Sequence, residues 1–197
     1  MMNKSFKEKE IKRWWDAKRQ LRWKNIYNGE DYASLALNNR EKIILHHLYK
    51  IKKKLNILEI GFGGGQLAYK ILKKGHNYKG IDISSTLTKI ANKRCRKYPK
   101  KNFSFRVGSF DKKLKFKDKN FDLVIMAGVL QYSSNPKFVF DEINRVLKNE
   151  GQFICAQTNF YKFHFFFKFK TFLIRLYYLL LNDEYLISDS FRSLFLE

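Results

Sequence analysis

A glycine-rich turn between a short apolar segment and an amphipathic segment constrains the fold of this chain more than any other feature. Residues 56–60 (Asn-Ile-Leu-Glu-Ile) are mostly apolar and partly β-branched, as in a parallel strand covered on both faces. Apolar residues then recur at helical spacing until Gly75, a typical residue after the end of a helix. Between them, four residues without Cβ atoms let the backbone bend sharply and approach a ligand: Gly61, Gly63, Gly64 and Gly65. This order predicts the nucleotide-binding turn of a doubly wound α/β fold.

The spacing of these glycines argues against a dinucleotide cofactor. A dinucleotide fingerprint that starts at Gly61 needs its third glycine at position 66, which is Gln66. The pattern is instead Glu59-x-Gly61-x-Gly63-x-Gly65, with an acid inside the end of the strand. S-adenosylmethionine has no pyrophosphate to place at the helix N-terminus, and its ammonium and sulfonium groups suit a carboxylate neighbour. We therefore expect Glu59 and the glycines to lie beside S-adenosylmethionine.

Strand-like and helix-like segments alternate along residues 55–159. Residues 77–84 predict a second strand that ends in Asp82, where an α/β site places the carboxylate that accepts ribose hydroxyls. Ser84 or Ser85 can cap the helix that follows. A later helix is expected to start at Asn135-Pro136, and further strands are expected at 102–107, 121–126 and 152–158. Short connections between five such repeats predict a mainly parallel, Rossmann-like sheet.

Five segments resemble, in order and spacing, the class I S-adenosylmethionine-dependent methyltransferases, in particular the broad type-11 family of mostly small-molecule enzymes. They are LEIGFGGG, GIDIS, FRVGSF, FDLVIMAGVLQYSSNP and FDEINRVLKNEGQFI. The resemblance implies that Glu59 and the glycines surround the methionine part of the cofactor. It also implies that Asp82, next to Ile83, holds the ribose. Positions matching Ser109 and Phe110 lie near the adenine in the family, and those matching Met126 and Ala127 lie where the fourth strand opens onto the methyl group.

The chain departs from the family pattern in two places. After the third strand the family usually has Gly-Asp-Ala, whose acid receives the adenine amino group, whereas this chain has Gly108-Ser109-Phe110. Asp111 is the alternative acid, because the segment up to Leu114 is one residue longer than usual. The family normally ends with an antiparallel hairpin at the sheet edge. Residues 160–197 do not contain two clear alternating strands, so we expect this hairpin to be reduced or missing.

Net charge leaves two interpretations. The chain has 40 Lys and Arg against 18 Asp and Glu, a net charge of +22, which fits a polyanionic partner such as RNA, DNA or an anionic membrane. It also fits the codon bias of an A+T-rich genome, which we prefer because the lysines are spread along the whole chain. After the fourth strand the chain has Ala127-Gly128-Val129-Leu130, whereas nucleic-acid amino-methyltransferases have Asn/Asp-Pro-Pro-Tyr. Nucleic acid is therefore the less favoured partner.

Two segments flank the predicted S-adenosylmethionine-binding core of residues 55–159. Residues 1–54 predict a helical cap segment before the first strand, and the resemblance implies that such a segment covers the cofactor pocket. Its aromatic residues equally fit simple packing onto the core. In the C-terminal segment, residues 160–197, the stretch 160–181 is very aromatic, and its charges recur too often for a transmembrane span. It predicts a basic amphipathic helix, which suits a membrane surface, an apolar substrate pocket, a dimer contact or plain core packing.

Other sequence features indicate a reducing compartment and no metal. Cys95 and Cys155 show no paired spacing, so we interpret both as reduced core residues. His46 and His47 are adjacent on a predicted helix and point in different directions, which argues against a metal pair. No apolar run follows Met1, so no signal peptide is apparent. We expect a cytoplasmic protein, with peripheral contact to the inner face of a membrane as the variant.

The expected reaction is in-line methyl transfer to oxygen, nitrogen or carbon of a small-molecule or lipid-like acceptor, in which placement of the nucleophile is the main task. Tyr132, just past the fourth strand, is the first candidate to contact the acceptor, and Gln131 is the second; both also fit a structural role in the loop. Two alternatives remain. One is an RNA methyltransferase that uses the basic surface. The other is a non-catalytic binding protein that keeps the methyltransferase fold, which the Ser109 departure allows.

Overall fold

The computed structural model describes residues 4–16, 29 and 32–156. One compact unit spans Met1–Cys155 and holds all the elements below, apart from Ala156 at the end of the last strand. Along the chain these elements are α1 (Lys4–Asp16), α3 (Tyr32–Tyr49), β1 (Asn56–Ile60), α4 (Gln66–Lys73), β2 (Asn77–Asp82), α5 (Ser85–Cys95), the 3₁₀ helix η2 (Lys100–Asn102), β3 (Phe103–Val107), β4 (Phe121–Ala127), the 3₁₀ helix η3 (Leu130–Tyr132), α6 (Pro136–Val146) and β5 (Leu147–Ala156).

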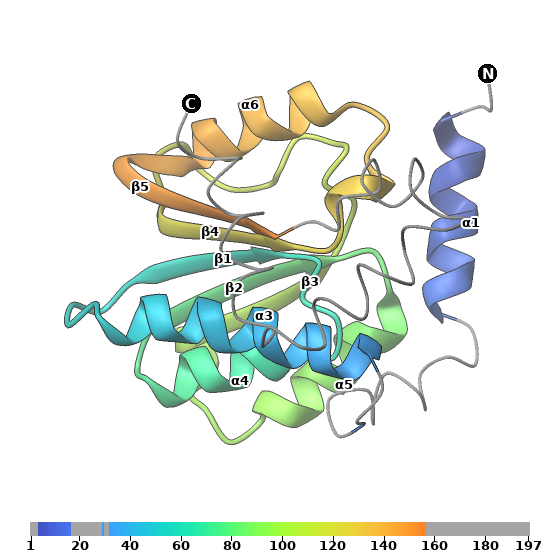
Figure 1. Ribbon diagram of the computed structural model, residues 1–197. Coiled ribbons are helices and arrows are strands. Elements are labelled where there is room, and N and C mark those ends of the chain that lie inside the picture. The colour runs from blue at the N-terminus through green and yellow to red at the C-terminus, as the bar shows by residue number, and fades with distance from the viewer. Residues whose placement is uncertain (1–3, 17–28, 30–31, 157–197) are drawn as a thin grey trace, which may run out of the picture. The chain divides into compact units, whose positions relative to one another are not determined.

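The strands form one open sheet in the order β3-β2-β1-β4-β5. β1 pairs in parallel with β2 and β4, and β2 pairs in parallel with β3. Figure 1 shows α3, α4 and α5 on one face of the sheet and α6 on the other. The predicted doubly wound, mainly parallel sheet is therefore confirmed. The order reverses direction at β1, and ligands of such sheets bind outside the carboxyl ends of the strands at this point.

Local sequence signals account for most element boundaries. Ser84 caps α5, because its hydroxyl accepts a hydrogen bond from the Leu87 amide at 3.1 Å. Asn135 caps α6 in the same way, accepting from the Phe138 amide at 3.2 Å, with proline as the first helical residue. Gly75 follows the end of α4 with a φ of 87°, a left-handed conformation that glycine adopts without strain.

The fifth strand differs from its prediction. It begins at Leu147, directly after α6, and not at Gln152. Gly151, the residue before the predicted start, lies inside this strand. A Cβ atom at Gly151 would lie 2.9 Å from the Lys148 carbonyl oxygen, so the close approach of the backbone, and not the end of an element, requires glycine here. The last residues of the predicted strand, 157 and 158, lie outside the described residues.

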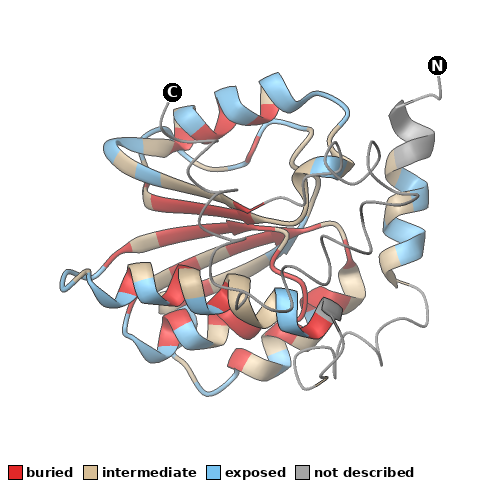
Figure 2. Cartoon of the chain, in the orientation of Figure 1, coloured by how far each residue is buried: buried red, intermediate tan, exposed pale blue. Residues whose placement is uncertain are grey.

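The two faces of the sheet carry separate apolar clusters, because side chains alternate along each strand. Ile57 packs with residues of α3, α4 and α5 on one face, and Leu58 and Ile60 pack with α6 on the other. Figure 2 shows the central strands as the most continuous buried part of the molecule. Cys95 is buried in α5 and Cys155 is half-buried in β5, and both are free thiols. The apolar faces thus fix the strand ends that carry the polar residues described below.

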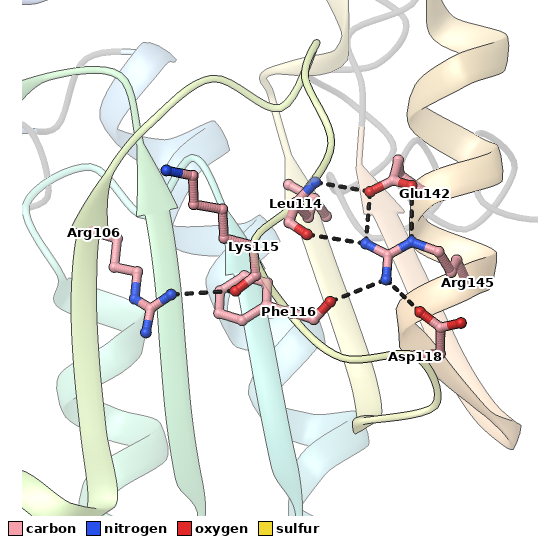
Figure 3. Close-up of polar contacts among 7 residues, drawn as sticks. All are labelled: Arg106, Leu114, Lys115, Phe116, Asp118, Glu142 and Arg145. Carbon is pink, nitrogen blue, oxygen red and sulfur yellow. Dashed lines mark hydrogen bonds and ion pairs between the residues drawn. The ribbon is translucent and has the colours of Figure 1, made fainter.

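A polar network fixes the loop between β3 and β4 (Figure 3). Glu142 on α6 accepts hydrogen bonds from the Leu114 amide at 2.7 Å and from Arg145 Nε and Nη2 at 2.8 and 2.7 Å. Arg145 also donates to the carbonyl oxygens of Leu114 and Phe116, both at 3.0 Å, and to Asp118. These contacts attach the second half of the loop that begins at Gly108 to α6.

In the described part of the chain, no helix is both long enough and apolar enough to span a bilayer. The predicted amphipathic segment 160–181 and the predicted reduction of the edge hairpin both concern residues outside the described ranges.

Candidate cofactor site

The glycine turn follows β1 at the point where the strand order reverses. Gly61, Gly63 and Gly65 have φ values of 78°, 55° and 74°, which residues with side chains rarely adopt. A Cβ atom at Gly65 would lie 2.8 Å from the Ala91 Cβ, and one at Gly61 would collide with Val129. The Gly61 amide donates to the Ile81 carbonyl at 2.8 Å, which ties the turn to β2. The turn is therefore a tightly held cradle that side chains at these positions would fill.

Asp82, at the end of β2, organises this cradle. Its Oδ2 accepts a hydrogen bond from the Gly63 amide and its Oδ1 accepts one from the Ser84 amide, both at 2.9 Å. Burial raises the pKa of Asp82, while backbone hydrogen bonds from Ser84, Gly63 and Ile83 act in the opposite direction. A carboxylate has about four acceptor positions, so these backbone bonds do not use all of them. The arrangement suits the acceptance of ribose hydroxyls, and half-buried Ile83 lies beside it.

Glu59 lies buried near the end of β1 and faces α3 and α4. Its Oε2 accepts a hydrogen bond from the Tyr78 hydroxyl at 2.8 Å. Burial raises the pKa of Glu59 to about 8, although the Tyr78 bond and the charge of Arg40 lower it in part. A bound cation beside such a carboxylate favours its ionised form. The sequence identified Glu59 but neither Tyr78 nor Arg40, which reach it from β2 and α3.

Ser109, Phe110 and Asp111 are the residues considered for the adenine side of the site, and the structure gives Asp111 a different environment from the other two. Ser109 and Phe110 are half-buried after β3, and Phe110 packs against the apolar cluster under α6. Asp111, however, accepts from the Ser133 hydroxyl at 2.6 Å and from the Ser134 amide and hydroxyl at 2.8 and 2.6 Å. These bonds join the loop after β3 to the loop after η3. They give Asp111 a structural task that the sequence did not indicate.

The predicted acceptor side lies past β4. Met126 is buried and Ala127 is half-buried at the end of this strand. Tyr132 in η3 contacts Trp15 of α1 edge to face, with 6.1 Å between the ring centroids, whereas Gln131 is exposed. The structure thus brings Tyr132 against an aromatic residue of the N-terminal segment.

α1 also reaches the cofactor side of the sheet. Asp16, at the end of α1, accepts hydrogen bonds from the Ser84 hydroxyl at 2.6 Å and from the Thr86 amide at 3.2 Å. It therefore places a negative charge at the N-terminus of α5, where the helix dipole favours one. These bonds contribute to the lowered pKa of Asp16, against the opposing effect of burial. No local pattern around Asp16 pointed to this contact.

The residues present fit S-adenosylmethionine. The cradle excludes side chains, Asp82 keeps free acceptor positions, and buried Glu59 suits an ammonium group. Within the described ranges, no cluster of three His, Cys, Asp or Glu side chains is arranged to hold a metal ion.

The known proteins to which this chain is similar include methyltransferases. Residues 58–155 match the family described as "Methyltransferase domain". A demethylmenaquinone methyltransferase of Tropheryma whipplei is 32% identical over 101 residues, 51% of this chain and 41% of the relative. A ubiquinone/menaquinone biosynthesis C-methyltransferase UbiE of Rickettsia bellii is 33% identical over 128 residues, 56% of this chain and 51% of the relative.

A crystal structure of a protein from Pyrococcus horikoshii OT3 matches with a TM-score of 0.56 and 29% identity, over 68% of this chain and 62% of that one. The chain spans about half the length of the curated relatives it matches.

Proposed function

Because residues 58–155 belong to the class I S-adenosylmethionine-dependent methyltransferases, we propose that this chain transfers the cofactor's methyl group to a small, lipid-like acceptor. The observation that carries the proposal is the bond between the Gly63 amide and Asp82, which holds the glycine turn open beside the buried Glu59. The two curated relatives named above are quinone-type methyltransferases, and their names support a lipid-like acceptor.

The cofactor, when bound, supplies a methyl group already activated on a positively charged sulfur. The residues of the chain therefore bind and orient more than they activate. Glu59 faces the ammonium of the methionine part, and that positive charge favours its ionised form. Asp82 accepts the ribose hydroxyls with the acceptor positions that its backbone donors leave free. The glycine turn lets the backbone approach closely, because no Cβ atom intervenes.

On the acceptor side, Trp15 and Tyr132 are the side chains that we assign to the apolar wall of the site. Aromatic side chains there exclude water from the reacting groups and pack against an apolar acceptor. In this proposal α1 acts as part of a cover over the carboxyl ends of the strands. The contact of Asp16 with the start of α5 supports this role for α1.

The test is transfer of a labelled methyl group from S-adenosylmethionine by the purified chain. Three acceptor preparations are offered separately: reduced demethylmenaquinone, a total lipid extract and total RNA. We expect incorporation into the quinol or the lipid extract, and none with the Gly63→Val variant. Incorporation into RNA alone would contradict the lipid-like acceptor, and the absence of cofactor binding would contradict the proposal as a whole.

A further inference from the structure

A basic pocket lies at the amino ends of two neighbouring strands. It has a volume of about 140 Å³, and its polar lining consists of Lys52, Lys53, Lys54, Lys74 and His76. These residues come directly before β1 and β2, which run parallel to each other. The glycine turn and the ribose-side carboxylate follow the carboxyl ends of the same strands. The basic pocket is therefore separate from the cofactor site.

His76 is the buried polar side chain of the basic pocket, with 5% of its surface exposed. Its Nδ1 accepts a hydrogen bond from the Leu55 amide at 3.2 Å. Because a backbone amide can only donate, Nδ1 carries no proton, and the neutral ring holds its proton on Nε2. Burial and the charges of Lys74 and Lys54 lower the pKa of His76, which favours this neutral form.

The Nε2–H group of His76 is a donor without a protein partner. Among the residues that the structure describes, the hydrogen bonds of His76 include one to Nδ1 and none to Nε2. Buried polar groups in folded proteins are nearly always hydrogen-bonded, so an unused donor in the lining of a pocket indicates a ligand or water there.

The four lysines that line the basic pocket have no acidic partner. In the described part of the chain none of them forms an ion pair, and Lys74 instead lies over the Tyr49 ring, with its Nζ 3.8 Å from the centroid. A carboxylate at this end of β1 is already used, because Asp122 accepts from the Asn56 amide and from Lys148 Nζ, both at 2.8 Å. The fold therefore gathers positive charge here without ion pairs.

Compensation of helix dipoles accounts for only part of this charge. α3 ends at Tyr49 and α4 ends at Lys73, so the carboxyl ends of two helices lie beside the basic pocket. Each helix end carries roughly half a negative charge, about one unit in all, against four lysine charges. Codon bias explains why lysine is common in this chain. It does not explain why two separate stretches, 52–54 and 74, meet around one buried donor.

We propose that the basic pocket binds a doubly charged phosphate group. Its volume of about 140 Å³ suits one such group, since pockets that enclose a whole drug-sized molecule measure roughly 300–1,000 Å³. Lysine ammonium groups attract phosphate as point charges, and His76 adds a donor whose direction the Leu55 amide fixes. The phosphate is either a free ion or the exposed phosphate of a lipid headgroup. This site is independent of the proposed methyl transfer.

Calorimetric titration with inorganic phosphate tests the proposal, in about 150 mM sodium chloride to screen nonspecific attraction. We expect saturable binding at one site, weakened at least about fivefold in the double variant Lys54→Gln/Lys74→Gln. Lys9→Gln/Lys89→Gln is the matched control. It removes the same charge from exposed positions on α1 and α5, and it should change the affinity less than about twofold. In the wild-type chain, saturating phosphate should also shift the imidazole NMR signals of His76.

Absence of saturable phosphate binding, equal losses in the two double variants, or unchanged His76 signals would each overturn the proposal. Co-sedimentation with phosphatidylcholine vesicles, with and without phosphatidic acid, identifies the source of the phosphate. Retention that requires phosphatidic acid and falls in Lys54→Gln/Lys74→Gln supports a lipid headgroup. No retention, or equal retention of the two double variants, supports a soluble phosphate. Both double variants should bind S-adenosylhomocysteine as the wild type does, so a failure of the proposed function would appear in that titration alone.

Discussion

Replacing Asp82 by asparagine should lower both the stability of the fold and the affinity for the cofactor. The carboxylate accepts from two backbone amides, those of Gly63 and Ser84. Asparagine has one acceptor oxygen, so its NH₂ group must face one of these donors. A hydrogen bond to a charged group contributes about 1.5–3 kcal/mol, and we expect Asp82→Asn to lower the free energy of unfolding by about that amount.

Cofactor affinity should fall as well, for two reasons. The glycine turn loses one of its anchors, and the ribose hydroxyls lose a charged acceptor. A loss of about 1.5–3 kcal/mol corresponds to roughly a 10- to 150-fold weaker binding constant. The assays are urea denaturation and calorimetric titration with S-adenosylhomocysteine, both at pH 8.

Asp122 provides a matched control at the opposite end of the strands. It accepts from the Asn56 amide and from Lys148 Nζ, both at 2.8 Å, so Asp122→Asn removes the same kind of interaction. It should destabilise the fold while leaving cofactor affinity within about twofold of the wild type. If Asp82→Asn and Asp122→Asn lose similar stability and both bind S-adenosylhomocysteine as the wild type does, Asp82 has no role in the cofactor site.

Three further predictions concern buried carboxylates. Glu142→Gln breaks the network of Figure 3 and should lower the free energy of unfolding by about 2–4 kcal/mol, measured by urea denaturation. Asp141→Asn is the control, because it breaks an exposed pair with Lys137 on the same helix, and it should lower this free energy by less than about 0.5 kcal/mol. Similar losses in the two variants would contradict the role of the network. The pKa of Glu59 is raised by burial to about 8, so between pH 5 and pH 8 the unfolded chain has lost a proton that the free folded chain keeps. Stability should therefore fall as pH rises through this window, and the slope should be smaller in Glu59→Gln; equal slopes would show that Glu59 is ionised throughout. Cofactor binding at pH 7 should release this proton, which titrations in two buffers of different ionisation enthalpy measure, and no release would contradict the pairing of Glu59 with the ammonium.

Features with a local cause were predictable from the sequence. The strand, glycine turn and helix around Gly63 follow from residue type and spacing alone, and so do the caps at Ser84 and Asn135. The position of Asp82 at the end of β2 was also predictable, because the apolar pattern of this strand ends there. In each case the residues that decide the structure lie within a few positions of one another.

Features that depend on packing between distant elements were not predictable. Arg40 and Tyr78 reach Glu59 from α3 and β2, and no pattern near either residue marks this contact. Asp16 is bonded to Ser84 across 68 positions of the chain. Glu142 and Arg145 belong to a segment that resembles the family, but their bonds to the loop after β3 required the fold. In a chain with many charged residues, the sequence does not indicate which acid and which base will be neighbours in the fold.

Equilibrium binding of S-adenosylmethionine and of NAD to the same preparation tests the central claim most directly. Because Gln66 stands where a dinucleotide site needs its third glycine, and because Glu59 is buried beside the turn, we expect saturable binding of S-adenosylmethionine at one site and no measurable binding of NAD. Gly63→Val should abolish the binding of S-adenosylmethionine. A valine residue cannot adopt the backbone φ of 55° without strain, and its side chain would fill the turn. Saturable binding of NAD, with no heat from S-adenosylmethionine, would contradict the account.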